Sequence, residues 1–270
     1  MAGGITLIGY GEAGSTFARA GAWGEQARVW DVKAERRAVA AADGLVAGDS
    51  AGDALAGSAL VLSLVTADSA LPAAQDYAAL VPAGAIWCDG NSVAPDTKRA
   101  AAKAVEAAGG IYVDMAVLAP VDPARLKVPL LLAGAGAAQA EALLRAAGFS
   151  NVRVVGDEVG RASAIKMIRS VMVKGLEALT AEMMMAAQKA GVVDEVLSSL
   201  DASEKAKPWA EKAAYNIERM VTHGIRRAAE MEESCKTLES LGIAPMMTGG
   251  TVQRQRDMAG KTERLIEGKE

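Results

Sequence analysis

Short apolar runs alternate with amphipathic, alanine-rich stretches over the first part of the chain. The apolar runs predict strands at 5–9, 27–31, 59–65, 85–90, 110–115, 128–134 and 152–156. Apolar residues at helical spacing predict helices near 13–22, 34–43, 69–80, 95–108 and 137–147. Continuous apolar strands separated by helices are typical of a parallel sheet with helices on both faces. We therefore predict a doubly wound α/β domain over residues 1–157.

The pattern changes after Gly160. Residues 162–191 contain no proline and place apolar side chains at helical spacing, which predicts one helix of roughly 30 residues. Further helical regions are expected from Pro208 to Gly242 and over 250–267. No strand pattern follows residue 157. We therefore predict an all-helical second domain over 158–270, which begins with the long interdomain helix.

The composition narrows the class of protein. Of the 270 residues, 51% are apolar and 23% are charged, as in ordinary soluble globular proteins. The net charge of −4 gives no reason to expect nucleic acid as a partner, because nucleic acid usually binds a basic face. No apolar run approaches the roughly 18 residues needed to cross a bilayer. The N-terminus also lacks the basic segment of a signal peptide.

Cysteine and histidine are scarce in the chain. Cys88 and Cys235 are too few and too far apart for a disulfide framework or a metal knuckle. A single histidine argues against a metal site built from histidines. These counts predict a reduced, cytoplasmic protein without a metal. The charge and the apolar runs give no sign of a nucleic acid or a membrane as partner, so we expect a small molecule as the partner.

The segment ITLIGYGEAGS begins with the first predicted strand and contains three glycines in the spacing G-x-G-x-x-G. In a strand–turn–helix, Gly9 allows a tight turn, Gly11 lets the backbone approach a pyrophosphate, and Gly14 permits close helix–strand packing. The N–H groups at the start of the helix and its dipole then hold the phosphates. Many glycine turns bind nothing, so this motif needs a second observation.

That second observation is Asp31, which ends the next predicted strand 17 residues beyond Gly14. An acid is expected about there to meet the ribose hydroxyls of a dinucleotide. A carboxylate repels the extra phosphate of NADP, so we expect NAD as the cofactor. Lys33, Arg36 or Arg37 could instead reach that phosphate, or could form only a solvated helix turn.

Five segments in this order give the chain a resemblance to a known family. They are GYGEAGS (9–15), VLSLVTADSAL (61–71), CDGNSVAPDTKR (88–99), GIYVDMAVLAP (110–120) and GRASAIKMIRS (160–170). Over nearly its whole length the chain resembles the β-hydroxyacid dehydrogenases, which include 3-hydroxyisobutyrate dehydrogenase and 6-phosphogluconate dehydrogenase. It looks closest to a divergent, 6-phosphogluconate dehydrogenase-like branch. The resemblance implies an NAD(P)-binding Rossmann domain, a helical C-terminal domain, and cofactor contacts at Glu12, Ala13, Val65 and Asn91.

Lys166 matches the catalytic lysine of this family. Oxidation of an alcohol requires removal of the hydroxyl proton as hydride leaves for the nicotinamide, and reduction runs the same step backwards. An amine within hydrogen-bond reach can serve in either direction if its pKa is lowered toward neutrality. Burial and the positive charge of Arg169 would both lower that pKa. The alternative interpretation is a surface lysine on a helix.

The neighbouring polar positions partly depart from the family pattern. Ser170 stands where the family usually has an asparagine that orients the substrate oxygen, so its shorter side chain implies a different substrate geometry. By resemblance, Asn91 and Ser92 line the pocket for nicotinamide and substrate, at the carboxyl end of a predicted strand. The alternative for this pair is a simple helix cap before Pro95.

A larger departure lies at residues 114–120. The family motif resembles D-A-P-V-S-G-G, whose small residues present backbone donors to a substrate carboxylate. This chain reads Asp-Met-Ala-Val-Leu-Ala-Pro there, with Val117 and Leu118 as the candidate substrate contacts. The glycine pair is missing, and Pro120 has no N–H to offer. We expect a bulkier or more apolar substrate than 3-hydroxyisobutyrate.

Another anion site is possible on the segment THGIRRAAEMEE. His223, Arg226, Arg227 and Glu230 are spaced at i, i+3, i+4 and i+7, which places them on one face of a predicted helix. Two arginines beside the only histidine could clamp a carboxylate or phosphate, within one subunit or across an interface. A solvated face with an Arg226–Glu230 pair is an equally good interpretation.

The helical domain also carries more apolar surface than so small a domain can bury. The methionine run at 183–185 lies on the long helix, where flexible apolar side chains favour packing over ligand binding. We therefore expect a homodimer or a larger homo-oligomer that assembles through this domain.

These patterns together predict an NAD(P)-dependent oxidoreductase that acts on a hydroxy acid or a related alcohol/carbonyl pair, with Lys166 as general acid and base. Imine reduction on the same scaffold is one alternative, although relatives with that activity usually lack the lysine. A catalytically silent dinucleotide-binding sensor is another, favoured by Ser170 and the altered 114–120 segment.

Overall fold

The computed structural model describes residues 4–203 and 206–261 of the chain. The contacts divide the chain into two compact units, the first ending at Ser170 and the second beginning at Val171. This division lies within the long helix, so the first turns of that helix belong with the first unit.

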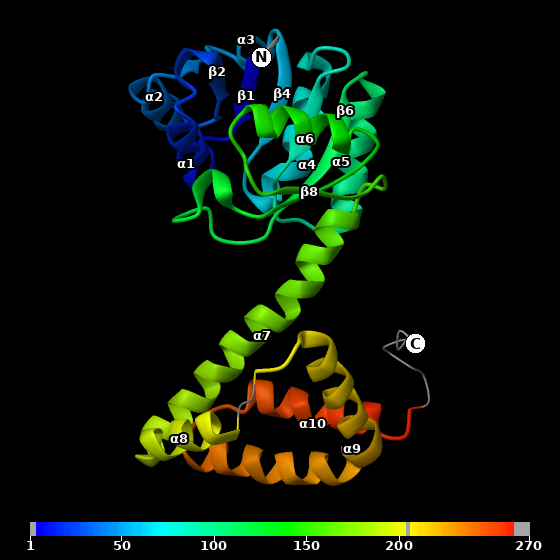
Figure 1. The fold of residues 1–270 in the computed structure, drawn as a ribbon. Coiled ribbons are helices and arrows are strands. Elements are labelled where there is room, and N and C mark those ends of the chain that lie inside the picture. Colours follow the sequence, from blue (N-terminus) through cyan, green and yellow to red (C-terminus); the bar gives the residue numbers. More distant parts are fainter. Residues whose placement is uncertain (1–3, 204–205, 262–270) are drawn as a thin grey trace. The chain divides into compact units, whose positions relative to one another are not determined.

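An eight-stranded sheet forms the centre of the first unit (Figure 1). Its strand order is β3-β2-β1-β4-β5-β6-β7-β8. Its strands are β1 (Gly4–Ile8), β2 (Ala27–Trp30), β3 (Val46–Ala47), β4 (Ser58–Ser63), β5 (Ile86–Asp89), β6 (Ile111–Val117), β7 (Leu130–Ala133) and β8 (Val152–Gly156). Neighbouring strands pair in parallel except β6 and β7, which are antiparallel. The expected parallel sheet is therefore confirmed, with one antiparallel pair that we did not predict.

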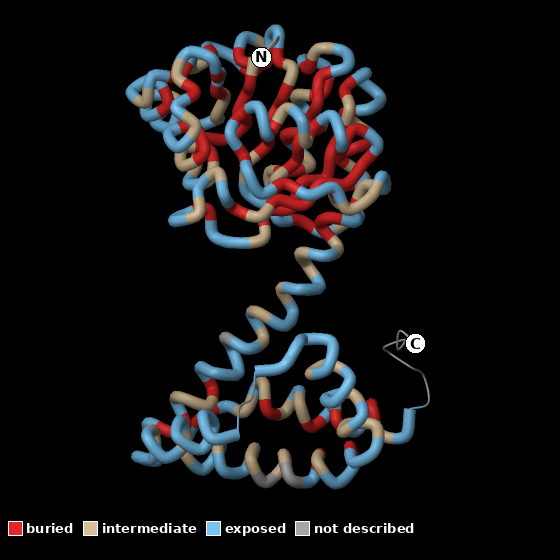
Figure 2. The backbone as a smooth tube through the Cα atoms, viewed as in Figure 1, coloured by how far each residue is buried: buried red, intermediate tan, exposed pale blue. Residues whose placement is uncertain are grey.

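Helices cover both faces of this sheet, as the continuous apolar strands predict. One buried cluster joins the sheet to α1 (Glu12–Gly21), α2 (Ala34–Ala42) and α6 (Ala137–Ala146). A second cluster joins the opposite face to α3 (Ala51–Leu55), α4 (Ala70–Tyr77) and α5 (Pro95–Ala107). Figure 2 shows the buried residues concentrated along the strands between these two layers.

The strand order changes direction between β1 and β4. From β1 the chain proceeds to β2 and β3 on one side, and then crosses to β4 on the other side. The connections after β1 and β4 therefore leave in opposite directions and open a crevice at the carboxyl ends of these strands. Ligands of α/β sheets bind at such a point.

All regular elements among the described residues of the second unit are helices. This unit contains most of α7 (Arg161–Ala190), together with α8 (Val193–Ser203), α9 (Trp209–Ser240) and α10 (Met246–Met258). The long helix predicted over 162–191 is confirmed almost to the residue. The helix predicted over 250–267 begins earlier than expected, and residues 262–267 lie outside the described part of the chain.

Candidate functional site

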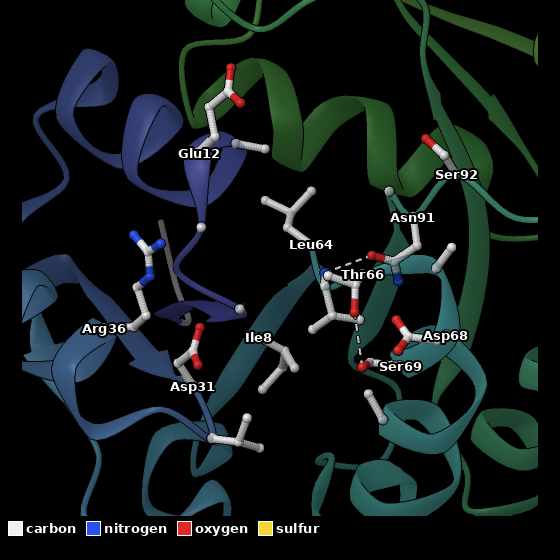
Figure 3. A pocket seen from close by; sticks show the side chains of 18 of the residues that line it. Ile8, Glu12, Asp31, Arg36, Leu64, Thr66, Asp68, Ser69, Asn91 and Ser92 are labelled. Carbon is white, nitrogen blue, oxygen red and sulfur yellow. Dashed lines mark hydrogen bonds between the residues drawn. The ribbon is translucent and has the colours of Figure 1, made fainter.

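A cavity of about 910 Å³ opens at the carboxyl ends of β1, β2, β4 and β5 in the first unit. This is a typical size for a site that holds a cofactor and a small substrate. Figure 3 shows Asp31 and Arg36 on one side of the cavity and Asn91 and Ser92 on the other, with the apolar side chains of Ile8 and Leu64 between them. The cavity therefore has a polar site at each end.

The three glycines of the β1–α1 turn have different surroundings. Gly9 has φ +96°, and an added Cβ would lie 2.5 Å from the carbonyl oxygen of Leu64. A Cβ on Gly14 would lie 2.5 Å from the carbonyl oxygen of Gly9, so α1 and the turn pack backbone against backbone. A Cβ on Gly11 would meet nothing within 4 Å, and this residue faces the cavity. These surroundings match the separate roles that the motif predicts.

Helix α1 directs its N-terminus at the cavity. Its N-cap is Gly11, which has no side chain to occupy the first N–H groups of the helix. Glu12 and Ala13 line the cavity, and the side chain of Glu12 is exposed. Backbone N–H groups and the positive end of a helix dipole favour a phosphate at such a position. The site therefore fits the pyrophosphate of a dinucleotide.

Asp31 follows β2 and is held by the same turn. Its Oδ2 accepts a hydrogen bond from the Tyr10 N–H at 2.8 Å, and its Oδ1 accepts one from the Lys33 N–H at 2.9 Å. The Arg37 guanidinium donates to the Asp31 carbonyl at 2.7 Å and lies 4.8 Å from the ring centre of Trp30. Of the three basic residues considered for NADP, Lys33 and Arg36 line the cavity.

Tyr10, between the first two glycines, anchors the turn to the domain. Its ring is fully buried, and its hydroxyl donates to Asp43 Oδ2 at 2.8 Å. Burial and the Asp43 carboxylate raise the pKa of Tyr10 well above its usual value, which keeps the hydroxyl protonated as a donor. Tyr10, which the glycine pattern leaves unspecified, thus has a structural role in holding the turn.

The segment after β4 forms a wall of the cavity that sequence reasoning largely missed. Residues 64–69 and Tyr77 line it, and Trp30 Nε1 donates to the Tyr77 hydroxyl at 3.0 Å. The hydrogen bond with Thr66 lowers the pKa of Asp68 below its usual value. Of these residues, only Val65 was predicted from the sequence. The place of the segment in the fold could have indicated the others, because it follows the strand beside β1 at the switch point.

Asn91 and Ser92 follow β5 and lie at the opposite end of the cavity from Asp31 (Figure 3). The side chain of Asn91 is buried, accepts from the Val65 N–H at 2.7 Å and donates to Ser63 Oγ at 3.0 Å. This amide therefore ties the end of β5 to the end of β4. The Ser92 hydroxyl is exposed.

Lys166 lines the same end of the cavity from the second turn of α7. Its Nζ donates to Ser92 Oγ at 2.6 Å. The neighbouring Arg169 donates through Nη1 to the carbonyl oxygen of Leu118 at 3.2 Å. Ser92 and Lys166 are 74 positions apart in the chain and meet at this end of the cavity. The sequence predicts both of them as residues of the pocket for nicotinamide and substrate.

The 114–120 segment contributes mainly apolar groups. Val117, at the end of β6, lines the cavity, as do residues 119–121. The Leu118 N–H donates to the Pro129 carbonyl at 3.0 Å and is therefore used by the β6–β7 connection. Three residues that were predicted for the site, Gly14, Leu118 and Ser170, are not among the described residues that line the cavity. Ser170 lies one turn beyond Lys166 on α7.

The predicted anion-binding face lies on α9 in the second unit. His223 and Arg226 are exposed, whereas Arg227 is half-buried. The side chain of Glu230 lies outside the described part of the chain. The role of this face in binding an anion stays a prediction.

The part of the chain that the structure describes contains no cluster of three or more His, Cys, Asp or Glu side chains arranged to hold a metal ion. None of its helices is both long and apolar enough to span a membrane.

Comparison with family models gives two matches. The model of the NAD-binding domain of 6-phosphogluconate dehydrogenase matches residues 4–155, which covers the Rossmann sheet. A model described as a domain of unknown function, DUF1932, matches residues 187–258 in the helical unit.

Individual relatives agree with these matches. An uncharacterized 28.5 kDa protein of Methanothermus fervidus is 31% identical over 195 residues, which cover 72% of this chain and 74% of the relative. The solved structure of a conserved hypothetical protein from Sinorhizobium meliloti is 35% identical, covers 95% of this chain and 88% of its own, and has a TM-score of 0.64. An imine reductase variant from Myxococcus stipitatus in complex with NAD⁺ is 18% identical, with a TM-score of 0.76 over 95% of this chain and 94% of its own. This last likeness shows the fold alone.

Proposed function

Because the chain belongs to the family that has the NAD-binding domain of 6-phosphogluconate dehydrogenase, we propose that it transfers hydride between a nicotinamide dinucleotide and a hydroxy acid or a related alcohol/carbonyl substrate. The observation that carries this proposal is the contact of Lys166 Nζ with Ser92 Oγ at 2.6 Å. This contact lines the same cavity as the glycine turn and Asp31. The lysine amine therefore lines the same cavity as the residues proposed to hold the dinucleotide.

The residues that would hold the dinucleotide form a continuous path along the cavity. Gly11 and the first turn of α1 would bind the pyrophosphate, and Asp31 would bind the adenosine ribose. Leu64 and Val65 would pack beside the nicotinamide half, with Asn91 holding Val65 in place. When bound, NAD(P) supplies the donor or acceptor of the hydride.

The protein's own part in the chemistry is proton transfer at the substrate oxygen. Lys166 would protonate this oxygen during reduction and accept its proton during oxidation. The Ser92 hydroxyl holds the amine at the cavity and could hydrogen-bond the same oxygen. We infer that Asn91 acts by fixing this loop, because its amide already bonds Val65 and Ser63. Ser170 stays a candidate that would act one turn further along α7.

The substrate end of the cavity is apolar apart from Lys166, Asn91 and Ser92. Val117 and residues 119–121 would contact the body of the substrate. The Leu118 N–H is already used within the sheet, so a family-type backbone nest for a carboxylate is disfavoured here. We propose that His223, Arg226 and Arg227 bind an anionic group of the substrate, within one subunit or across an interface between subunits. Arg226→Ala should therefore raise KM for an anionic substrate and leave KM for an uncharged one unchanged.

The proposal is tested by turnover with a panel of hydroxy acids, ketones and imines, each offered with NAD or NADP in the appropriate redox state. The Lys166→Ala variant should lose about 10²- to 10⁴-fold in kcat, the usual contribution of general acid–base catalysis. Its affinity for the reduced cofactor, measured by fluorescence titration, should stay unchanged. Lys174→Ala is the matched control, because Lys174 is an exposed lysine on the same helix.

Three outcomes would contradict parts of this proposal. Equal activity of Lys166→Ala and the parent chain would remove the catalytic role of Lys166. Turnover of imines but not of hydroxy acids would favour the imine reductase alternative. Tight binding of a dinucleotide without turnover of any panel member would favour the silent sensor.

We also propose NAD rather than NADP as the preferred cofactor. Two backbone N–H groups hold the Asp31 carboxylate at the cavity, where it would accept from ribose hydroxyls and repel a 2′-phosphate. Direct titration should therefore show that NADH binds about tenfold or more tightly than NADPH, a difference of roughly 1.4 kcal/mol. Arg36→Ala should weaken NADPH binding and leave NADH binding unchanged. Tighter binding of NADPH by the parent chain would overturn this preference.

A further inference from the structure

A cluster of charged side chains is buried beside the loop that carries Asn91 and Ser92. Asp89, Lys98 and Asp114 are each 1% exposed or less. Lys98 Nζ donates to Asp89 Oδ1 at 2.9 Å and lies 3.6 Å from Asp114 Oδ1. The Tyr112 hydroxyl donates to Asp89 Oδ2 at 2.6 Å, and burial raises the pKa of Tyr112 far above its usual range. Nothing in the proposed chemistry uses this cluster directly.

Two carboxyl groups face the single amine of Lys98, which cannot hydrogen-bond all of their oxygen atoms. The start of α7 supplies further donors. Asp114 Oδ2 accepts hydrogen bonds from the N–H of Gly160 at 3.1 Å, the N–H of Ser163 at 2.9 Å and the hydroxyl of Ser163 at 3.0 Å. A carboxylate at a helix N-terminus is favoured by the helix dipole. Asp114 is therefore the side chain that fixes the first turn of α7 to the sheet.

The helix start is also packed closely against α5, which carries Lys98. A Cβ added to Gly160 would lie 2.3 Å from Arg99 Nη1 and 3.2 Å from the Cβ of Pro95. The first turn of α7 thus has little room to shift. Lys166 follows Ser163 by three residues, so its position depends on this turn.

The same cluster holds the partner of Lys166. Asp89 Oδ1 accepts from the Asn91 N–H at 2.9 Å, which fixes the loop that presents Ser92. Asp114 holds the helix that presents Lys166, and Lys98 links the two carboxylates. Both sides of the Lys166–Ser92 contact are therefore attached to one buried group of charges.

We propose that Asp114 is a positioning residue, which orients Lys166 toward Ser92 by holding the first turn of α7. The importance of this orientation for turnover rests on the proposed function, but the orientation itself does not require turnover to be measured. Asparagine has the same shape as Asp114, but one of its two carboxyl oxygens is replaced by an NH₂ donor. That NH₂ group must face either the Lys98 amine or the N–H groups of α7, and both of these are donors. We therefore expect the helix start to lose its fixed position in Asp114→Asn.

The test is competitive labelling of the folded protein with trace acetic anhydride, with each lysine quantified by peptide mass spectrometry. An amine that is held in a hydrogen bond must leave its partner before it can attack the anhydride, so it reacts slowly. In Asp114→Asn, the labelling rate of Lys166 relative to Lys174 should rise about fivefold, as expected for loss of one hydrogen bond worth ~1 kcal/mol. Ser163→Ala removes one donor to Asp114 and should give a smaller rise.

Three controls make the result specific. Ser92→Ala removes the partner of Lys166 directly and should raise the same ratio. Ser50→Ala removes the side chain that caps α3 through the Asp53 N–H at 3.1 Å, and α3 carries no residue of the site, so the ratio should not change. Lys98 is buried and should stay unlabelled in every folded variant, which reports an intact core. If Asp114→Asn does not fold, the result for Ser163→Ala decides.

The proposal is overturned if Asp114→Asn and Ser163→Ala leave the ratio unchanged, or if Ser92→Ala does. With a substrate from the panel, Asp114→Asn should lower kcat between about tenfold and a hundredfold, since small displacements of catalytic groups have effects of that size. KM and the affinity for NADH should change little. Failure to find any substrate would count against the proposed function, whereas the labelling ratio would still decide the role of Asp114.

Discussion

Gly11 and Gly14 illustrate how the same residue type acts in different ways within one turn. Gly14 lies against the backbone of Gly9, whereas Gly11 faces open space in the cavity. Gly11 also has φ −80° and ψ −156°, an extended conformation that alanine adopts without strain. The fold therefore needs a glycine at position 14, and only a bound ligand would need one at position 11.

This difference predicts opposite effects of two alanine substitutions. Gly14→Ala should lower the melting temperature, because its Cβ would lie 2.5 Å from the carbonyl oxygen of Gly9 and the turn would have to shift. Gly11→Ala should keep the melting temperature of the parent chain and weaken NADH binding by about tenfold or more, a loss of roughly 1.4 kcal/mol. Calorimetry and fluorescence titration measure the two quantities. Unchanged NADH binding by Gly11→Ala would argue against a pyrophosphate at this turn.

At the residue scale, the sequence predicts those site residues that belong to a single short motif. The cavity is lined by Gly9 and Gly11 of the glycine turn, by Asp31 after β2 and by Lys166 near the start of α7. Each of these residues belongs to a short segment with a recognisable pattern. The engagement of Asn91 with Val65 and Ser63 was not predictable, because it joins segments 26 and 28 residues apart. The Asp89–Lys98–Asp114 cluster also escaped prediction, since a lysine within an amphipathic helix ordinarily faces solvent.

At the scale of elements, one carboxylate joins α7 and α10 within the second unit. Glu182, on α7, is buried and accepts from the N–H of Met247 at 2.8 Å and the N–H of Thr248 at 2.9 Å. The Thr248 hydroxyl bonds the same carboxylate at 2.5 Å. Burial alone would raise the pKa of Glu182, but these hydrogen bonds outweigh it and hold this pKa below its usual value.

The lowered pKa of Glu182 predicts how stability depends on pH. A carboxyl group with a lowered pKa in the folded state stabilises the fold above its unfolded pKa, about 4.3 for glutamate, and loses this contribution as the pH falls through the folded value. Glu182→Gln should lower the free energy of unfolding at neutral pH by about 2 kcal/mol, a value within the usual range for a hydrogen bond to a charged group. The difference between the two proteins should shrink below pH ~4. Denaturant titration across pH measures both effects.

Glu218→Gln provides the control, because Glu218 is exposed on α9. It should leave both the stability and its pH dependence nearly unchanged. A Glu182→Gln variant as stable as the parent chain at neutral pH would show that the carboxylate does not hold α10.

Strongly periodic elements were predicted well, and short ones were not. The seven predicted strands and helices α5, α7 and α9 match their patterns within one or two residues, because their apolar residues recur at the period of a strand or of a helix. Strand β3 has two residues and α3 has five, too few to show a period. Helix α8 was also missed, and none of its described residues is buried, so no core-facing pattern marks it.

At the scale of the whole molecule, the second unit buries few large side chains. Its buried hydrophobic residues, among those described, are Ala186, Ala187, Ala228, Ile243, Val252 and Met258. On α7, Ile168, Met172, Leu176 and Leu179 recur every three or four residues and so share one face, and all four are exposed. Figure 2 shows this helix as mostly exposed or intermediate along its length. A contiguous apolar face of this kind marks an interaction surface.

A second copy of the chain suits this face best. Met172, Leu176 and Leu179 lie on the part of α7 that belongs to the second unit, so the occupant of this face must pack along an apolar helix surface. The same helix of a second copy has the matching length and character, and a twofold dimer pairs identical surfaces. We therefore expect light scattering after size-exclusion chromatography to give about twice the chain mass of 27.7 kDa.

Charge substitutions on α7 separate this expectation from its alternatives. Leu176→Glu combined with Leu179→Glu should shift the protein to the monomer mass, since burying a charge at an apolar interface is costly. Lys174→Glu is the matched control: it alters charge on the same helix away from the apolar face and should leave the dimer intact. A monomeric parent chain would contradict self-association. A dimer that survives the double substitution would place the interface elsewhere and leave the apolar face of α7 for another occupant.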